Sequence, residues 1–201
     1  MPPNHEDRPG AGAWVPDRVT RASLAEGVAA CQGCELYRNA THGVPGDEED
    51  RQGKPFVGPA GRLLEKALDS AGVDPSSVYL TNVVKHFRWD PGRAGKRIHK
   101  GPSRVHVAAC HPWLLAELDL VKPRGVVLLG STAGAAVFGP SFRVGASRGH
   151  ALEWPEEYSA WSPEWALATT HPSAVLRSRQ RHEDLAALVA DLSNIPPLLS
   201  R

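Results

Sequence analysis

Short apolar, β-branched runs that alternate with helical segments most strongly limit what this chain can fold into. Three runs are typical of buried parallel strands: residues 78–84, 126–129 and 166–170. Helical periodicity marks residues 59–71, 132–138 and 185–192. Strands that alternate with helices predict an α/β fold, here a three-layer α/β/α sandwich with a mostly parallel central sheet.

Length and composition predict one folded domain. The chain has 201 residues, 41% of them hydrophobic, and a formal charge of +1. It has neither an apolar run of membrane-spanning length nor a signal-peptide start, so we expect a cytoplasmic monomer that makes no membrane contact. Residues 1–18, rich in Pro, Gly and charge, are predicted to be a disordered leader. Residues 19–195 then form the domain and 196–201 a tail.

Polar residues follow the predicted strands. Asn82 lies near the end of the first run, Ser131 follows the second and His171 follows the third. Working residues in parallel sheets collect beyond the carboxyl ends of the strands. These positions are therefore candidates for chemistry.

A basic segment stands out between residues 85 and 104. It contains seven Lys and Arg residues against one Asp, for a local charge of +6, together with several glycines. We expect a loop that contacts nucleic-acid phosphates, and the alternative is a solvated loop that binds nothing. Basic residues at 177, 179 and 181 add a second cluster.

Three cysteines suggest metal chemistry. Cys31 and Cys34 form a Cys-x2-Cys pair, and Cys110 is the third. The third cysteine argues against a simple redox pair. Iron–sulfur and zinc sites both need a fourth ligand, for which His86 and His111 are candidates by position. The ligands alone leave iron–sulfur, zinc and no metal open.

Several separate blocks then carry a resemblance to a known family. They are Cys31-x2-Cys34-x-Leu36-Tyr37-Arg38, Pro45-Gly46-Asp47-x-x-Asp50, Gly53-x-Pro55-Phe56-Val57-Gly58-Pro59-Ala60-Gly61-Arg62-Leu63-Leu64, Tyr79-x-Thr81-Asn82-x-Val84-Lys85 and His171-Pro172-Ser173-x-x-Leu176-Arg177. In order and spacing these blocks resemble the iron–sulfur uracil-DNA glycosylases of family 4, over about residues 22 to 192. The resemblance implies uracil-containing DNA, preferably single-stranded, as the partner.

The resemblance also implies roles for single residues. Cys31, Cys34 and Cys110, with His86 in place of a fourth cysteine, would hold a structural [4Fe-4S] cluster, with zinc as the alternative. Phe56 would stack on a flipped uracil, Asn82 would read its edge, and His171 would hydrogen-bond the leaving base. The remaining substrate contacts would come from Gly46, Arg97, Ser173 and Arg177.

The insertion Gly95-Lys96-Arg97-Ile98-His99-Lys100 narrows the resemblance to the UdgX branch, whose members become covalently attached to DNA. His99 would then capture the sugar C1′ after the base leaves. Its basic neighbours disfavour protonation of the ring, which suits a nucleophile.

The chain departs from the family before Pro45. The resemblance predicts an apolar first strand ending in Gly-Glu-Gln, but Gly43 and Val44 occupy the last two positions and the strand is missing. Asp47 and Asp50 would then carry the remaining acid–base or electrostatic role. Two alternatives follow: an ordinary glycosylase that turns over, and a uracil-DNA binding module without chemistry.

Overall fold

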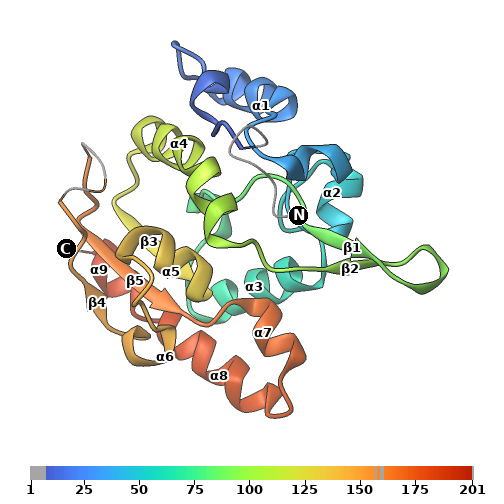
Figure 1. The fold of residues 1–201 in the computed structure, drawn as a ribbon. Coiled ribbons are helices and arrows are strands. Elements are labelled where there is room, and N and C mark those ends of the chain that lie inside the picture. The colour runs from blue at the N-terminus through green and yellow to red at the C-terminus, as the bar shows by residue number, and fades with distance from the viewer. Residues whose placement is uncertain (1–7, 157, 159–160, 201) are drawn as a thin grey trace. The chain divides into compact units, whose positions relative to one another are not determined.

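The structure is a computed structural model that describes residues 8–156, 158 and 161–200. It divides into two compact units. Unit 1 contains residues up to Gly58 and from Thr81 to Val121, and unit 2 contains Pro59–Leu80 and the chain from Lys122 onward. Each unit is described separately (Figure 1).

Unit 2 is built on a three-stranded sheet with the order β3-β5-β4. Strand β3 (Gly125–Leu129) pairs in parallel with β5 (Trp165–Thr169), and β4 (Ala151–Leu152) pairs antiparallel with β5. The central position of β5 explains why its run is apolar without alternation: four of its five residues are buried. The predicted runs at 126–129 and 166–170 are thus confirmed as strands.

Helices cover both faces of this sheet. Ala168 packs with Val137 of α5 (Gly130–Phe138), whereas Thr169 donates a hydrogen bond to Asp191 of α8 (Arg181–Leu192). Successive side chains on a strand point to opposite faces, so α5 and α8 lie on opposite sides. The α/β fold with three layers is confirmed in unit 2, although its sheet is mixed rather than mostly parallel, with one parallel and one antiparallel pair of strands.

Three helices of unit 2 form the layer that contains α8. Helix α3 (Pro59–Ser70) packs on both α7 (Pro172–Arg177) and α8. Its buried face consists of Gly61, Leu63, Leu64, Ala67 and Leu68, which agrees with the predicted amphipathic helix. The unit is completed by η4 (Pro75–Ser77), α6 (Val144–Ser147) and α9 (Ile195–Leu199).

Unit 1 is mainly helical, with one short hairpin. Its longest helix, α4 (Arg104–Val121), buries Trp113 completely. The other elements are η2 (Gly12–Trp14), α1 (Arg21–Ala30), η3 (Glu35–Asn39), α2 (Asp47–Gln52), β1 (Trp89–Pro91), η5 (Arg93–Gly95) and β2 (Arg97–His99). In the described part of the chain no helix is long and apolar enough to cross a membrane.

The predicted strand at residues 78–84 is wrong. No residue of this segment belongs to a strand, and among the described residues no strand precedes Trp89. A strand needs a hydrogen-bonded neighbour, and the first strand that the family resemblance predicts is missing from this sequence. The segment therefore runs as irregular chain, held by the side-chain contacts described below.

The basic segment is also more ordered than a loop. Strands β1 and β2 pair antiparallel, with Trp89 opposite His99 and Asp90 opposite Ile98. Gly92 and Gly95 lie in the turn, where Gly95 has a φ of +73°. The loop predicted over residues 85–104 therefore contains a hairpin, from Trp89 to His99 (Figure 1).

The ends of the chain differ from the predicted leader and tail where the structure describes them. Arg8 pairs with Glu35, and Ala11 is buried and donates its N–H to Ala109 O at 2.8 Å. Residues 1–7 and 201 lie outside the described residues. At the other end, residues 195–199 form α9, which includes the first residues of the predicted tail at 196–201.

Candidate active site

The three cysteines of unit 1 lie close together and are buried. Cys31 ends α1, Cys34 precedes η3 and Cys110 lies in α4; each is 3–4% exposed. A hydrogen bond from the Cys110 thiol lowers the pKa of Cys34 to about 7, and the same contact together with burial raises the pKa of Cys110. Cys34 is thus prepared to be a thiolate, the form that binds metals.

His86 adds an imidazole beside these thiols. Burial lowers the pKa of His86, which keeps the ring neutral and able to coordinate a metal. Together with Cys31 and His42 it lines a cavity of about 210 Å³. The donor types thus suit a metal cofactor by their chemistry. Within the described residues, however, no three His, Cys, Asp or Glu side chains are grouped so that they could hold a metal ion.

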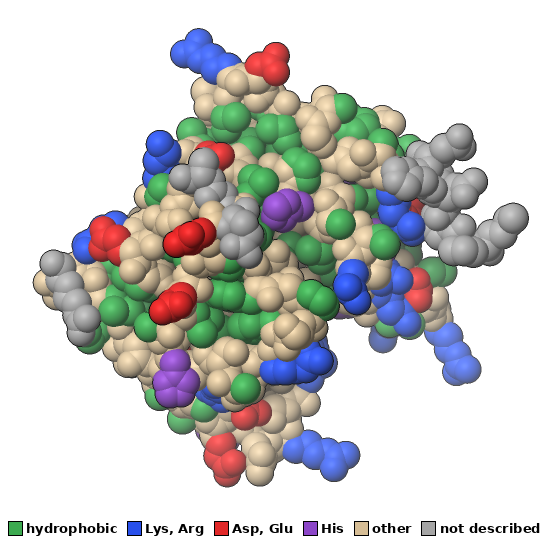
Figure 2. Space-filling model, turned by 60° about the vertical axis from the view of Figure 1, so that its left-hand side comes forward, with side chains coloured by type: hydrophobic (Ala, Val, Ile, Leu, Met, Phe, Trp, Pro, Cys, Tyr) green, Lys and Arg blue, Asp and Glu red, His purple; other side chains and the backbone are tan. Residues whose placement is uncertain are grey.

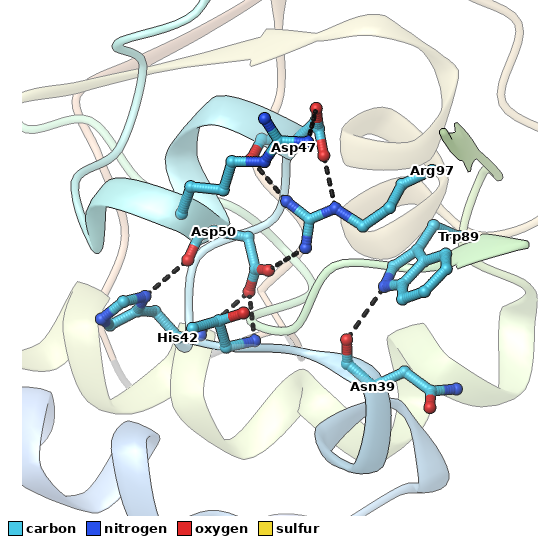
Figure 3. A network of polar contacts seen from close by, with 8 residues as sticks. Asn39, His42, Asp47, Asp50, Trp89 and Arg97 are labelled. Carbon is cyan, nitrogen blue, oxygen red and sulfur yellow. Dashed lines mark hydrogen bonds and ion pairs between the residues drawn. The ribbon is translucent and has the colours of Figure 1, made fainter. Parts of the chain in front are cut away.

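Helix α2 carries the two predicted carboxylates, and Arg97 binds both (Figure 3). Arg97 Nε donates to Asp47 Oδ1 and Arg97 Nη1 to Asp50 Oδ2, each at 2.5 Å. Asp50 is fully buried, and its Oδ1 accepts the backbone N–H groups of Thr41 and His42 at 2.8 and 2.9 Å. The contacts of Asp50 are those of a structural carboxylate, while Asp47 stays 38% exposed at its side chain.

The same guanidinium attaches the hairpin to the core of unit 1. Arg97 stacks on the rings of Phe87 and Trp89, at 5.2 and 5.7 Å from their centroids. The Trp89 indole N–H donates to Asn39 O at 2.9 Å. Arg97 was predicted to contact substrate, but its side chain is committed to two carboxylates and two rings. We infer from these contacts that it positions the hairpin.

His99 is placed on this hairpin with its ring near the protein core. The ring centroids of His99 and Phe87 are 5.4 Å apart. Arg97 and His99 alternate with Ile98, so both lie on one face of β2 while Ile98, which is 50% exposed, lies on the other. His99 itself is exposed. The residue predicted as the nucleophile is thus exposed at the end of β2.

Phe56 and Gly46 have unusual backbone conformations. Phe56 has a φ of +56°, a region that bulky residues rarely occupy, and its ring is half-buried. Gly46 has a φ of +138°, and a Cβ there would lie 2.2 Å from the Glu49 carboxylate. Glu49 in turn accepts the N–H of Gly58 at 3.0 Å. Backbone strain of this kind is concentrated at binding sites.

Unit 2 holds the other predicted residues. His171 is the N-cap of α7, and its Nδ1 accepts the N–H of Ser173 at 3.1 Å. The neutral ring therefore carries its proton on Nε2, which makes that nitrogen a hydrogen-bond donor. Arg177, at the end of α7, is exposed.

Gly130, which sequence reasoning missed, sets the space for His171. It follows β3 with a φ of +82°, and a Cβ there would lie 2.8 Å from His171 Cβ. Only glycine combines that backbone angle with so close an approach. A glycine directly after an apolar strand was the available signal. Glu49, also missed, was hidden in an acidic run.

The basic residues of the 85–104 segment belong to unit 1, whereas Arg177, Arg179 and Arg181 belong to unit 2. Figure 2 shows Lys and Arg in several separate groups among hydrophobic and acidic side chains on the face it displays, as the net charge of +1 leads one to expect. Around the hairpin the exposed cations are Arg93, Lys96, Lys100 and Arg104. Lys100 pairs with Asp90 at 3.2 Å.

Comparison with known proteins identifies the family of this chain. The family profile of the Uracil DNA glycosylase superfamily matches residues 44–193, about three quarters of the sequence. The chain therefore belongs to the uracil-DNA glycosylase superfamily.

Within this superfamily, the chain is similar to several type-4 uracil-DNA glycosylases. The chain is 32% identical over 173 residues to the type-4 uracil-DNA glycosylase of Thermotoga maritima, an alignment that covers 78% of this chain and 83% of the relative. It is 28% identical over 174 residues to the type-4 uracil-DNA glycosylase of Archaeoglobus fulgidus, with the same coverage. A third type-4 uracil-DNA glycosylase, from Sulfurisphaera tokodaii, is 28% identical over 174 residues and is 74% covered.

Proposed function

We propose that this chain is a uracil-DNA glycosylase of the UdgX type, which excises uracil and is then captured at the sugar through His99. The observation that carries the finer part of this proposal is the attachment of the His99 hairpin to α2 by Arg97. Such attachment holds an exposed imidazole in a fixed place. Family membership supports the coarser part, excision of uracil.

The proposed reaction begins with a uracil turned out of the DNA stack. Phe56 supplies an aromatic face for the base, and the amide of Asn82 offers both a donor and an acceptor to its edge. Because cytosine presents the opposite donor and acceptor pattern, this amide distinguishes the two bases. The exposed cations of the hairpin bind phosphates, so we expect affinity to fall with salt.

Bond cleavage releases the base with the electron pair of the N1–C1′ bond. C1′ gains oxocarbenium character, and negative charge develops on the uracil. The Nε2–H of His171 suits a hydrogen bond to that developing charge. In unit 1, the exposed carboxylate Asp47 faces the positive sugar in this proposal, whereas Asp50 serves only to hold Arg97 and the residues before α2.

Capture then forms a new C1′–N bond. A ring nitrogen of His99 donates its lone pair to C1′, and the proton on the other ring nitrogen passes to the departing uracil anion or to water. The products are free base and a neutral, sugar-substituted imidazole. No external oxidant or reductant is required.

A [4Fe-4S] cluster on Cys31, Cys34, Cys110 and His86 is part of the proposal. When bound, the cluster joins α1, η3 and α4 and supplies no chemistry to the cleaved bond. The buried thiols and the neutral His86 support this assignment, and zinc is the alternative. An iron–sulfur cluster absorbs visible light and a zinc site does not. The visible absorbance of purified protein, together with its iron and zinc content, therefore decides between the two metals.

The test of the proposed function is a labelled single strand containing uracil, mixed with the protein and heated in denaturing detergent. The proposal expects free uracil and a heat-stable protein–DNA band, both absent with a thymine strand. His99→Ser should abolish the band while leaving DNA affinity within about twofold. His150→Ser, at an exposed histidine of unit 2, is the matched control and should keep the band.

Other outcomes identify the alternatives. Uracil release without the band in the unmodified protein overturns capture and indicates a glycosylase that turns over. Binding to the uracil strand with neither product indicates a binding module, because the Glu of the first motif is missing. A band that persists in His99→Ser refutes the role of His99.

A further inference from the structure

Lys85 and Glu117 form a buried ion pair that the proposed reaction does not use. Their side chains are 5% and 11% exposed, and Lys85 Nζ lies 2.6 Å from Glu117 Oε2. Lys85 belongs to the basic segment that was predicted to contact phosphates. Its burial in unit 1 removes it from that surface, so the pair needs another explanation.

Each proton of the Lys85 ammonium group has an acceptor. Nζ donates to Glu117 Oε2, to Thr81 Oγ1 at 2.8 Å and to the backbone carbonyl of Asn82 at 2.9 Å. The Thr81 hydroxyl donates to Glu117 Oε2 at 2.6 Å. One of the acceptors in this network is the backbone of the residue proposed to read the base.

This network holds a segment that has no strand partner. Residues 81–86 lie irregularly, but the Lys85 side chain bonds Glu117, and the neighbouring Val84 packs in one buried cluster with Cys110. Cys110 and Glu117 are seven residues apart on α4, two helical turns, and so lie on the same face. Helix α4 supplies by side chains the contacts that a neighbouring strand would supply by its backbone.

We propose that the Lys85–Glu117 pair positions Asn82 and thereby sets the selectivity for uracil. Lys85 fixes the Asn82 carbonyl, and Glu117 with Thr81 fixes Lys85. Readout of a base edge by one amide requires placement within about 0.5 Å, which an unpaired chain segment does not provide alone. Lys85 and Glu117 are positioning residues, and the inference rests on the proposed role of Asn82.

Glu117→Gln tests the proposal because it weakens the hold on Lys85 at constant volume. Single-turnover uracil release should slow by about tenfold. The decisive readout is a double-mutant cycle with Asn82→Ala. If Glu117 acts through Asn82, the double variant is no slower than Asn82→Ala alone, whereas additive losses overturn the inference.

A matched pair at Thr81 repeats the test if Glu117→Gln does not fold. Thr81→Ser keeps the hydroxyl and should release uracil at the rate of the unmodified protein within about twofold, whereas Thr81→Val removes it and should lose about fivefold. Equal rates for the two variants overturn the proposal.

A second measurement separates this inference from the proposed chemistry. The ratio of affinities for a uracil strand and a cytosine strand depends on Asn82 whether or not a base is released. If the unmodified protein releases no uracil, the proposed chemistry fails, and the same cycle on this ratio still decides the inference. Glu117→Gln should lower the ratio about tenfold, but not in the Asn82→Ala background.

Discussion

His171 in unit 2 stands at the end of a strand that is paired on both sides, whereas His99 in unit 1 stands on a two-stranded hairpin that the side chain of Arg97 attaches to α2. The first arrangement uses backbone hydrogen bonds and apolar layers. The second uses a few buried polar contacts between segments far apart in sequence. The stability of unit 1 should therefore be more sensitive than that of unit 2 to single substitutions of polar residues.

Asp50→Ala should have the largest effect on the stability of unit 1. The change leaves Arg97 without its buried partner and two backbone N–H groups without an acceptor, so we expect a loss of about 4 kcal/mol in the free energy of unfolding of unit 1. Hydrogen exchange should accelerate in β1 and β2 but not in β3 and β5. Glu48→Ala, at an exposed carboxylate of the same helix, is the control and should change neither. Equal acceleration in both units would contradict the comparison.

Arg97→Lys should have the next largest effect. Lysine keeps the charge but loses the planar fork that reaches both carboxylates and stacks on two rings, so we expect a cost of about 2 kcal/mol. Under the proposed function, the yield of the heat-stable band should fall more than uracil release does. Arg93→Lys, exposed in the hairpin turn, is the matched control. A variant that captures DNA as well as the unmodified protein would show that Arg97 acts only as a charge.

Gly130→Ala tests the surroundings of His171 in unit 2. Alanine at a φ of +82° costs about 1 kcal/mol, and its Cβ would also push against His171. Gly139 has a φ of +83° with nothing within 4 Å of a Cβ, so Gly139→Ala carries the backbone cost alone. Melting temperatures should fall for both variants, but uracil release should fall only for Gly130→Ala. Equal rates of uracil release by the two variants would contradict the proposed role of His171 in the reaction.

Glu164→Gln should have the smallest effect. Glu164 pairs with Arg124 at 2.8 Å on the surface of unit 2, and this contact lowers the pKa of Glu164. A lowered pKa contributes stability above the unfolded value that is lost as pH falls through the folded value. Solvent screens this pair, so the melting temperature at neutral pH should change by no more than about 1 °C. A larger shift would show that surface charges stabilise unit 2 after all.

The sequence predicted those elements whose pattern is local. Strands β3 and β5 and helices α3, α5 and α8 all follow from runs or periodicity of their own residues. Helix α4 was missed because its own apolar residues lie on all of its faces, so no single face stands out. It also contains Pro112, a residue that usually ends a helix. The run at 78–84 has the composition of a strand, but a strand also depends on a partner elsewhere in the chain.

Some contacts of the candidate site were likewise expected from the sequence, and others were not. The nearness of Cys31, Cys34 and Cys110 was expected from spacing and resemblance, and the structure brings these thiols together. The commitment of Arg97 to Asp47 and Asp50 was not expected, because residues about 50 positions apart give no local signal of pairing. The burial of Lys85 was hidden for the same reason, since its partner Glu117 is 32 residues away.

Helix α4 carries both Cys110 and Glu117. Its two turns from Cys110 to Glu117 fix an axial separation of about 10 Å between the cysteine cluster and the network beneath Asn82. One residue inserted between them would rotate Glu117 by about 100° away from Lys85 while leaving Cys110 in place. In the proposed function, the register of this one helix connects cluster binding to base selection.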